Sequence, residues 1–195
     1  MKGFYLFSSA YPVLLMKNPI VYTLVGGLIL FVWQFLSFAM LNLHGSASEH
    51  TPLQDPILER LAELELEAGM YALGTLSQED YQDPAKVEAY LAEQDGQPWA
   101  ILNYHKEWSS DMTPNLVRSL MMNLLIAFGL FWLFGKAAAQ SKLANVAIAV
   151  VIGLIAFAFH PYSQFIWFKA PDIWAHLLDS VVPFAALGFL APTAE

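Results

Sequence analysis

The chain has 195 residues, of which 57% are hydrophobic and 13% are charged. Soluble domains average about 45–50% apolar and about 25% charged residues, so this sequence carries more apolar surface than one soluble core would bury. It contains no cysteine, which excludes disulfides and thiolate metal sites. Its net charge is -8, and the 14 acidic and three basic residues between Leu43 and Asn115 would repel a phosphate backbone, which excludes nucleic acid as a partner.

The first predicted element is a transmembrane helix at residues 19–43. The segment from Ile20 to Leu43 has no charged residue, and about 20 apolar residues suffice to cross the hydrocarbon core of a bilayer. A secretory signal peptide is the alternative, but its apolar region is only about 7–15 residues long. Residues 1–18 are predicted to be a cytoplasmic or interfacial segment, because their tyrosines and phenylalanines favour the membrane surface.

Residues 44–114 are predicted to form a small, acidic α+β domain outside the membrane. From Pro56 to Ala68, apolar residues recur at helical spacing opposite a row of glutamates, which indicates an amphipathic helix. A second helix is predicted at 83–93, where Asp-Pro provides a start signal. The apolar runs at 70–73 and 99–104 are typical of short strands.

Three further transmembrane helices are predicted at residues 115–135, 143–159 and 172–191. The middle one is rich in alanine, valine and glycine, which is typical of a helix packed among other helices. Lys136 and Lys142 lie between two of these spans, and lysine favours the cytoplasmic side of a membrane. We therefore expect an all-α transmembrane four-helix bundle with a small α+β extramembrane insert, with both termini cytoplasmic and the insert periplasmic.

Three short stretches resemble a group of uncharacterised small four-span bacterial inner-membrane proteins that carry an extracytoplasmic insert between spans 1 and 2. The stretches are Val25-Gly26-Gly27 followed by Phe31, Trp33, Ser37, Leu41 and His44, then Glu67 to Leu73, and then Trp167 to Pro171 leading to Leu178-Asp179. The resemblance implies a bacterial inner-membrane setting and the same four-span fold, but no activity. The loop from His160 to Trp167 departs from the group, because it holds fewer tryptophans.

The strongest candidate site is a polar cluster at the start of the fourth span. Asp172, His176 and Asp179 are spaced four and three residues apart, which puts them on one face of a helix. His160 is expected at the same depth, and Arg118 lies in the first turn of the second span. Charged groups inside a membrane cost about 2.5–3.5 kcal/mol on insertion scales and usually face the protein interior. The five residues therefore form a candidate intramembrane cluster for a proton relay or a bound metal ion.

A structural role explains the same residues without any ligand. Asp172 follows Pro171 and is then an N-cap, His176 lies at the wet interface, and only Asp179 is buried, paired with a polar group on another span. The cluster also lacks a known metal-ligand spacing such as His-Glu-x-x-His. We favour the N-cap role for Asp172, and we predict no metal, no cofactor and no catalytic residue.

Other polar and small residues are predicted to pack the helices against one another. On the second span polar side chains recur every four residues, and small residues on the first two spans allow close backbone approach. The predicted packing positions are Asn115, Ser119, Asn123, Gly26, Gly27 and Gly129. Three histidines with irregular spacing, His44, His50 and His105, are predicted to be solvated or capping residues rather than metal ligands.

The functional expectation is a non-enzymatic accessory or scaffold subunit of an inner-membrane protein complex, in contact with lipid and with other membrane subunits. It rests on the expected folded insert, on the polar packing stripe, and on the lack of a phosphate-binding loop, a Gly-x-Ser-x-Gly elbow or paired hydrolase carboxylates. The alternative is a small proton-coupled transporter, or a metal- or cofactor-binding membrane protein, that uses Asp179, His176 and His160.

Overall fold

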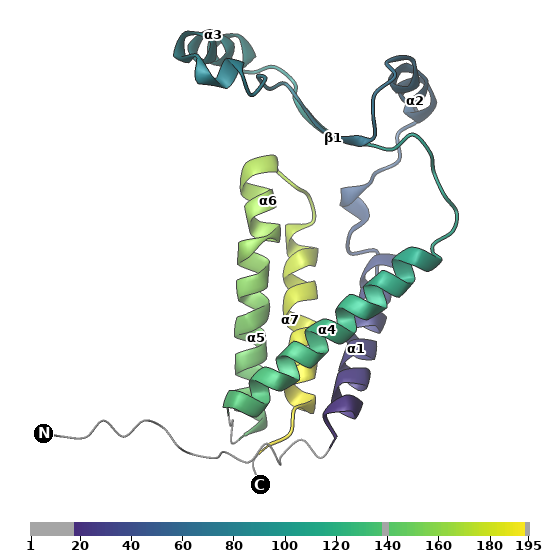
Figure 1. Ribbon diagram of the computed structural model, residues 1–195, viewed down its shortest axis with the longest axis vertical. Coiled ribbons are helices and arrows are strands. Elements are labelled where there is room, and N and C mark those ends of the chain that lie inside the picture. Colours follow the sequence, from purple (N-terminus) through teal and green to yellow (C-terminus); the bar gives the residue numbers. More distant parts are fainter. Residues whose placement is uncertain (1–17, 138–140, 194–195) are drawn as a thin grey trace, which may run out of the picture. The chain divides into compact units, whose positions relative to one another are not determined.

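The computed structural model describes residues 18–137 and 141–193, and these residues are mostly helical (Figure 1). Internal contacts divide the chain into two compact units. We call residues 1–49 with 111–195 the helical unit and residues 50–110 the insert, and each is described by itself. The predicted interfacial segment lies, except for Asn18, outside the described residues.

The helical unit contains four stretches that are long and apolar enough to cross a membrane, as predicted. They are α1 (Pro19–Phe35) with the π-helical turn η2 (Leu36–Met40), α4 (Thr113–Ala137), α5 (Lys142–Phe159) with α6 (Pro161–Phe168), and α7 (Ile173–Leu190). A short 3-10 turn, η3 (Gly45–Ala47), follows the first stretch.

Local side chains explain where several of these helices begin and end. The Asn18 side chain accepts a hydrogen bond from the Val21 backbone N–H at 3.3 Å, and Pro19 occupies the first helical position of α1, where its missing N–H costs nothing. The Ser141 hydroxyl caps α5 in the same way. Lys169 has a left-handed backbone, with φ 52°, and this conformation ends α6.

The prediction that residues from His160 to Trp167 form a loop is wrong, because α6 is helical. Pro161 is its first residue, the one helical position where proline removes no hydrogen bond. The backbone N–H of Gln164 then bonds to the His160 carbonyl at 3.0 Å. The third membrane-length stretch therefore extends from Lys142 to Phe168.

The helices pack mainly as two pairs, α1 with α4 and α5 with α7, and α1 also contacts α7. A Cβ atom at Gly26 would lie 2.7 Å from the Phe131 ring, and one at Gly153 would overlap the backbone carbonyl oxygen of Ser180. Small residues therefore allow close approach within both pairs. The buried apolar core of the helical unit consists of Leu30, Ala127, Leu130, Phe131, Phe134, Ala149, Leu187 and Ala191.

The two other predicted packing glycines behave differently from each other. A Cβ atom at Gly27 would lie 2.6 Å from the Leu124 side chain of α4, so this glycine lies against the neighbouring helix. A Cβ atom at Gly129 would meet nothing within 4 Å. Among the described residues Gly129 therefore makes no close helix contact of the kind predicted for it.

The insert has the predicted order of helix, strand, helix and strand. Its elements are α2 (Gln54–Glu63), β1 (Gly69–Leu73), the 3-10 turn η4 (Asp80–Gln82), α3 (Pro84–Gln94) and β2 (Ala100–Tyr104). The strands are antiparallel, with Gly69 opposite Tyr104 and Leu73 opposite Ala100. The first helix ends at Glu63 rather than at the predicted Ala68, and Glu65 follows with a left-handed backbone, φ 51°.

Candidate functional site: a histidine between two carboxylates

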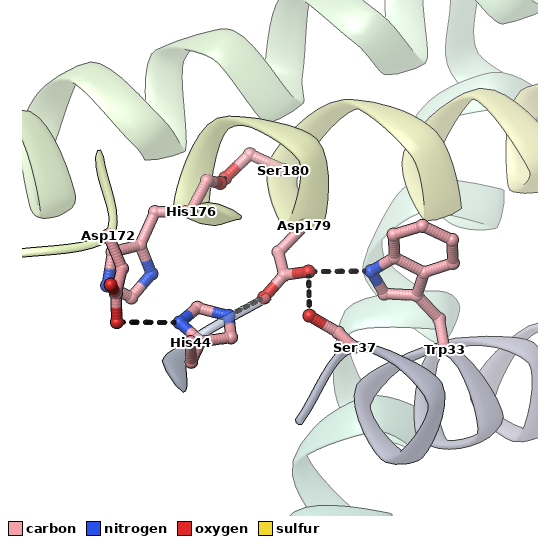
Figure 2. A network of polar contacts seen from close by, with 7 residues as sticks. All are labelled: Trp33, Ser37, His44, Asp172, His176, Asp179 and Ser180. Carbon is pink, nitrogen blue, oxygen red and sulfur yellow. Dashed lines mark hydrogen bonds and ion pairs between the residues drawn. The ribbon is translucent and has the colours of Figure 1, made fainter. Parts of the chain in front are cut away.

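The Asp179 carboxylate on α7 accepts hydrogen bonds from three side chains of the first membrane-length stretch and the loop after it (Figure 2). The Trp33 indole N–H and the Ser37 hydroxyl both donate to its Oδ1, at 2.8 and 2.7 Å. The His44 Nε2 lies 2.8 Å from its Oδ2. Asp179 therefore pairs with polar groups of another span, and the contact joins α1 to α7.

The His44 ring lies between two carboxylates and is only 6% exposed. Its Nε2 faces Asp179, and its Nδ1 lies 3.6 Å from Oδ2 of Asp172 (Figure 2). Phe38 stacks on the ring with the centroids 3.9 Å apart and the planes within 6° of parallel. These contacts leave the imidazole little freedom to rotate, because the carboxylates fix the position of its nitrogens and Phe38 fixes the plane of its ring.

Asp172 lies at the N-cap of α7 as predicted, but its side chain does not make the capping hydrogen bond expected of that position. Asp172 occupies the N-cap position, but its backbone is left-handed, with φ 63°, and its carboxylate bonds to no backbone N–H of the helix. Instead, Oδ1 accepts a hydrogen bond from the Ser46 hydroxyl. Its other oxygen, Oδ2, is buried and has no hydrogen-bond partner within residues 18–137 and 141–193.

His176 completes the group from the next turn of α7. Its ring lies edge-on to the His44 ring, with the centroids 4.9 Å apart. Ligand-type atoms of His44, His176 and Asp179, one from each side chain, lie within 4.8 Å of one another. We call His44, Asp172, His176 and Asp179 the His–Asp cluster.

The chain after α1 places His44 in the cluster by leaving the α-helical path. The π-helical turn η2 contains Ser37, and such turns are frequent at functional sites. The Leu43 N–H then bonds to the Ser37 carbonyl at 3.0 Å, and Asn42 has a left-handed backbone, with φ 48°. This reversal brings His44 to α7 instead of continuing the helix.

The structure brings together three of the five predicted cluster residues, Asp172, His176 and Asp179. The other two, His160 and Arg118, are exposed. Within the described part of the chain, neither side chain makes a hydrogen bond or an ion pair. The cluster in the structure is therefore built around His44, and not around His160 or Arg118.

The prediction that His44 is a solvated or capping residue is wrong. Trp33, Ser37 and Ser46 were not among the predicted site residues. One signal was available, because Trp33 and Ser37 are four residues apart and hence share a helical face within an otherwise apolar span. His50 and His105 are exposed and belong to the insert.

A second polar contact joins α1 to α4. The Gln34 side-chain oxygen accepts hydrogen bonds from the Ser119 hydroxyl and from the Asn123 amide, each at 2.8 Å. Asn123 is buried, whereas Asn115, the first member of the predicted stripe, is exposed. Two of the three stripe residues therefore meet at Gln34, a residue that sequence analysis did not single out.

The His–Asp cluster has the groups needed to bind a cation or to share protons. Two carboxylates face one imidazole, and a neutral imidazole carries a single N–H. Either a proton or a metal ion would satisfy the second ring nitrogen and offset the negative charge.

Comparison with known proteins adds nothing to these observations: no protein-family model, no curated protein and no solved structure matches this chain.

Proposed function

We propose that this protein is a multi-pass membrane protein whose insert binds a partner subunit, and that it acts as a non-enzymatic accessory or scaffold component of a membrane complex. The observation that carries the proposal is that no residue from His50 to Ser110 is buried. A two-stranded sheet by itself is marginally stable at best in water. A partner protein that covers the insert would supply the core that it lacks.

Large apolar and aromatic side chains of the insert face solvent in the isolated chain. Trp108 is 88% exposed and Met70 is 74% exposed. The others include Leu53, Ile57, Leu58, Leu64, Leu73, Tyr81, Leu91, Trp99 and Ile101. Aromatic residues and methionine are enriched at protein interfaces, where a few of them supply most of the binding energy.

One part of the insert is hollowed in a way that suits a basic side chain. An open hollow of about 550 Å³ is lined by three aromatic rings, Tyr81, Tyr90 and Trp99, and by Asp95. The Tyr90 hydroxyl is buried and has no hydrogen-bond partner among the described residues. An arginine or lysine of the partner would stack on the rings and pair with the carboxylate.

Charge favours a different protein over a second copy of this chain. The insert carries 12 acidic and three basic residues between His50 and Ser110. Two inserts facing each other would repel, and so would an insert and an anionic lipid surface. We therefore assign the insert a protein partner with a basic surface.

Lysine placement supports a bacterial inner-membrane arrangement with both termini in the cytoplasm and the insert in the periplasm. Lys136 and Lys142 stand at the end of α4 and the start of α5, and lysine-rich short loops stay on the cytoplasmic side. Because the chain has no cysteine, single-cysteine variants report topology directly. An impermeant maleimide added to intact cells with a permeable outer membrane should label Gln97→Cys and not Gly135→Cys, and the reverse pattern would overturn the arrangement.

The partner is tested by purifying the tagged full-length chain from native membranes in mild detergent. We expect one stoichiometric protein partner to co-purify with the wild type. Raised salt should weaken its binding, and Trp99→Ala and Asp95→Lys should abolish it. Trp132→Ala, which removes an exposed tryptophan of α4, is the matched control and should keep the partner. A lone monomer in several detergents, with an insert that resists protease, would show that the insert needs no partner.

A further inference from the structure

We propose that His44, His176 and Asp179 form a binding site for one divalent transition-metal ion of the zinc type, with Asp172 as the carboxylate that orients His44. This inference goes beyond the proposed partner-binding role and does not depend on it, because the cluster lies in the helical unit and the partner surface lies in the insert.

The three ligand side chains are close enough to share one ion. One atom from each of the three side chains lies within 4.8 Å of the others, and His44 Nε2 is 2.8 Å from Asp179 Oδ2. Zinc binds nitrogen and carboxylate oxygen at about 2.0–2.2 Å, so two tetrahedral ligands lie about 3.3 Å apart. The shortest gap must widen by about 0.5 Å and the longest must close by at most about 1.5 Å, which small side-chain rotations achieve.

A neutral His44 ring has too few protons to donate to both of its carboxylate neighbours. A neutral imidazole has one N–H, yet its two nitrogens face two carboxylates. A metal ion on Nε2 would leave the proton on Nδ1, where Asp172 Oδ2 lies 3.6 Å away and lacks a hydrogen-bond partner in the described chain. The buried oxygen would then become an acceptor. Zinc-bound histidines are usually oriented by a carboxylate in this way.

The two carboxylates of the cluster carry negative charge that a metal ion would neutralise. The Asp172 side chain is fully buried and that of Asp179 is 19% exposed. Within the described residues, no lysine or arginine pairs with either of them. Two such carboxylates would carry a charge of −2 at the end of an apolar helix pair, which is costly. One divalent ion neutralises that charge, whereas a protonated His44 offsets only half of it.

The Asp179 carboxylate is already oriented for binding by its neighbours. Trp33 and Ser37 both donate to Oδ1 of Asp179, which leaves Oδ2 for the ion. Phe38 holds the plane of the His44 ring. Asp172 adopts a left-handed backbone, which is uncommon for a residue with a side chain and is found at functional sites. These are features of a site formed before its ligand binds.

The donor set decides the class of metal ion. Two imidazoles and one carboxylate suit zinc and its neighbours in the first transition row, while magnesium and calcium prefer oxygen ligands throughout. Three protein ligands leave the fourth tetrahedral position open to water or to an exchangeable ligand.

The test uses the full-length protein in detergent, stripped with a chelator and titrated with Zn²⁺ by calorimetry and with Co²⁺ by visible absorption. We expect one ion per chain in the wild type, with tetrahedral Co²⁺ bands. His176→Ala should weaken binding by more than a hundredfold, and its fold should be intact because the His176 side chain makes no hydrogen bond within the described residues. Asp172→Asn should weaken binding about tenfold to a hundredfold.

His105→Ala is the control, because His105 is an exposed histidine of the insert. It should bind the ion as the wild type does. A folded wild type that takes up neither Zn²⁺ nor Co²⁺ would overturn the proposal. Binding that persists at full affinity in His176→Ala would place the ion elsewhere and would overturn it as well.

Discussion

His44 and Asp179 lie 135 residues apart in the sequence, and their side chains are 2.8 Å apart in the structure. His44 follows the first membrane-length stretch, and Asp179 lies in the second turn of the last one. The contact therefore connects the segment leaving α1 to the beginning of α7. The same carboxylate accepts hydrogen bonds from Trp33 and Ser37 of the first stretch.

Removing one donor from Asp179 should destabilise the helical unit. In Trp33→Phe the ring is kept and the N–H is lost, so the carboxylate keeps two donors. We expect a loss of about 1–2 kcal/mol in the free energy of unfolding, measured by circular dichroism in mixed micelles. Trp132→Phe, a change at an exposed tryptophan of α4, is the control and should cost less. Equal values for the two variants would contradict the role of the Trp33 N–H.

Glycine-to-alanine changes should distinguish packed from open helix faces. Gly153→Ala places a methyl group against the backbone carbonyl oxygen of Ser180, and α5 and α7 must then separate. We expect a cost of about 1–3 kcal/mol in the free energy of unfolding. Gly129→Ala is the matched control, since its methyl group would meet nothing within 4 Å. This substitution should leave the free energy of unfolding unchanged or raise it slightly. A large loss of stability in Gly129→Ala would show that α4 has an unrecognised neighbour.

Gln34 should contribute more to the pairing of α1 with α4 than the exposed end of the polar stripe does. Gln34→Leu removes the oxygen that accepts from Ser119 and Asn123, and leaves the buried Asn123 amide without that acceptor. A loss of about 0.6–2 kcal/mol is expected in the same unfolding assay. Asn115→Ala changes an exposed residue of the stripe and should leave the free energy of unfolding unchanged. The prediction fails if both changes have the same effect.

The insert should show a depressed carboxyl pKa at Asp80. Hydrogen bonds from the Lys86 ammonium and the Ser77 hydroxyl hold the pKa of Asp80 below its ordinary value of 3.8. Because the folded pKa is the lower one, the contribution of Asp80 to stability is present above about pH 3.8 and disappears as the pH falls through the folded pKa. Carbon-detected NMR of the carboxyl groups in micelles would give the titration midpoint directly.

Lys86→Met should raise the Asp80 midpoint towards 3.8, since it removes the largest cause of the shift. Lys106→Met is the control, because Lys106 pairs with Glu67 and not with Asp80. An Asp80 midpoint that stays in place in Lys86→Met would show that the Lys86 contact does not form in solution.

Most of the fold could be predicted because long apolar stretches leave few alternatives to a helix. Each long apolar stretch must satisfy its own backbone polar groups, and a helix is the way for a single segment to do so. The loop predicted from His160 to Trp167 failed for a local reason, since proline at the first position of α6 permits a helix. The early end of α2 depends on the left-handed backbone of Glu65, which the apolar pattern does not encode.

The candidate site could be predicted only on its α7 side. The spacing of Asp172, His176 and Asp179 puts them on one face, and the structure places all three beside His44. His44 itself lies beyond a π-helical turn and a left-handed Asn42, where no regular period relates it to α1. Its position depends on α1 meeting α7, which the pattern of neither helix specifies.

The contact between α1 and α7 is the seam along which the two helix pairs of the helical unit meet. Buried apolar residues such as Leu30 and Leu187 lie towards one end of that seam, and the polar contacts of Asp179 lie towards the other. Apolar burial is non-directional, whereas the hydrogen bonds to Asp179 require particular residues of the two segments to face each other. The polar end therefore sets the register in which α1 and α7 pack against each other.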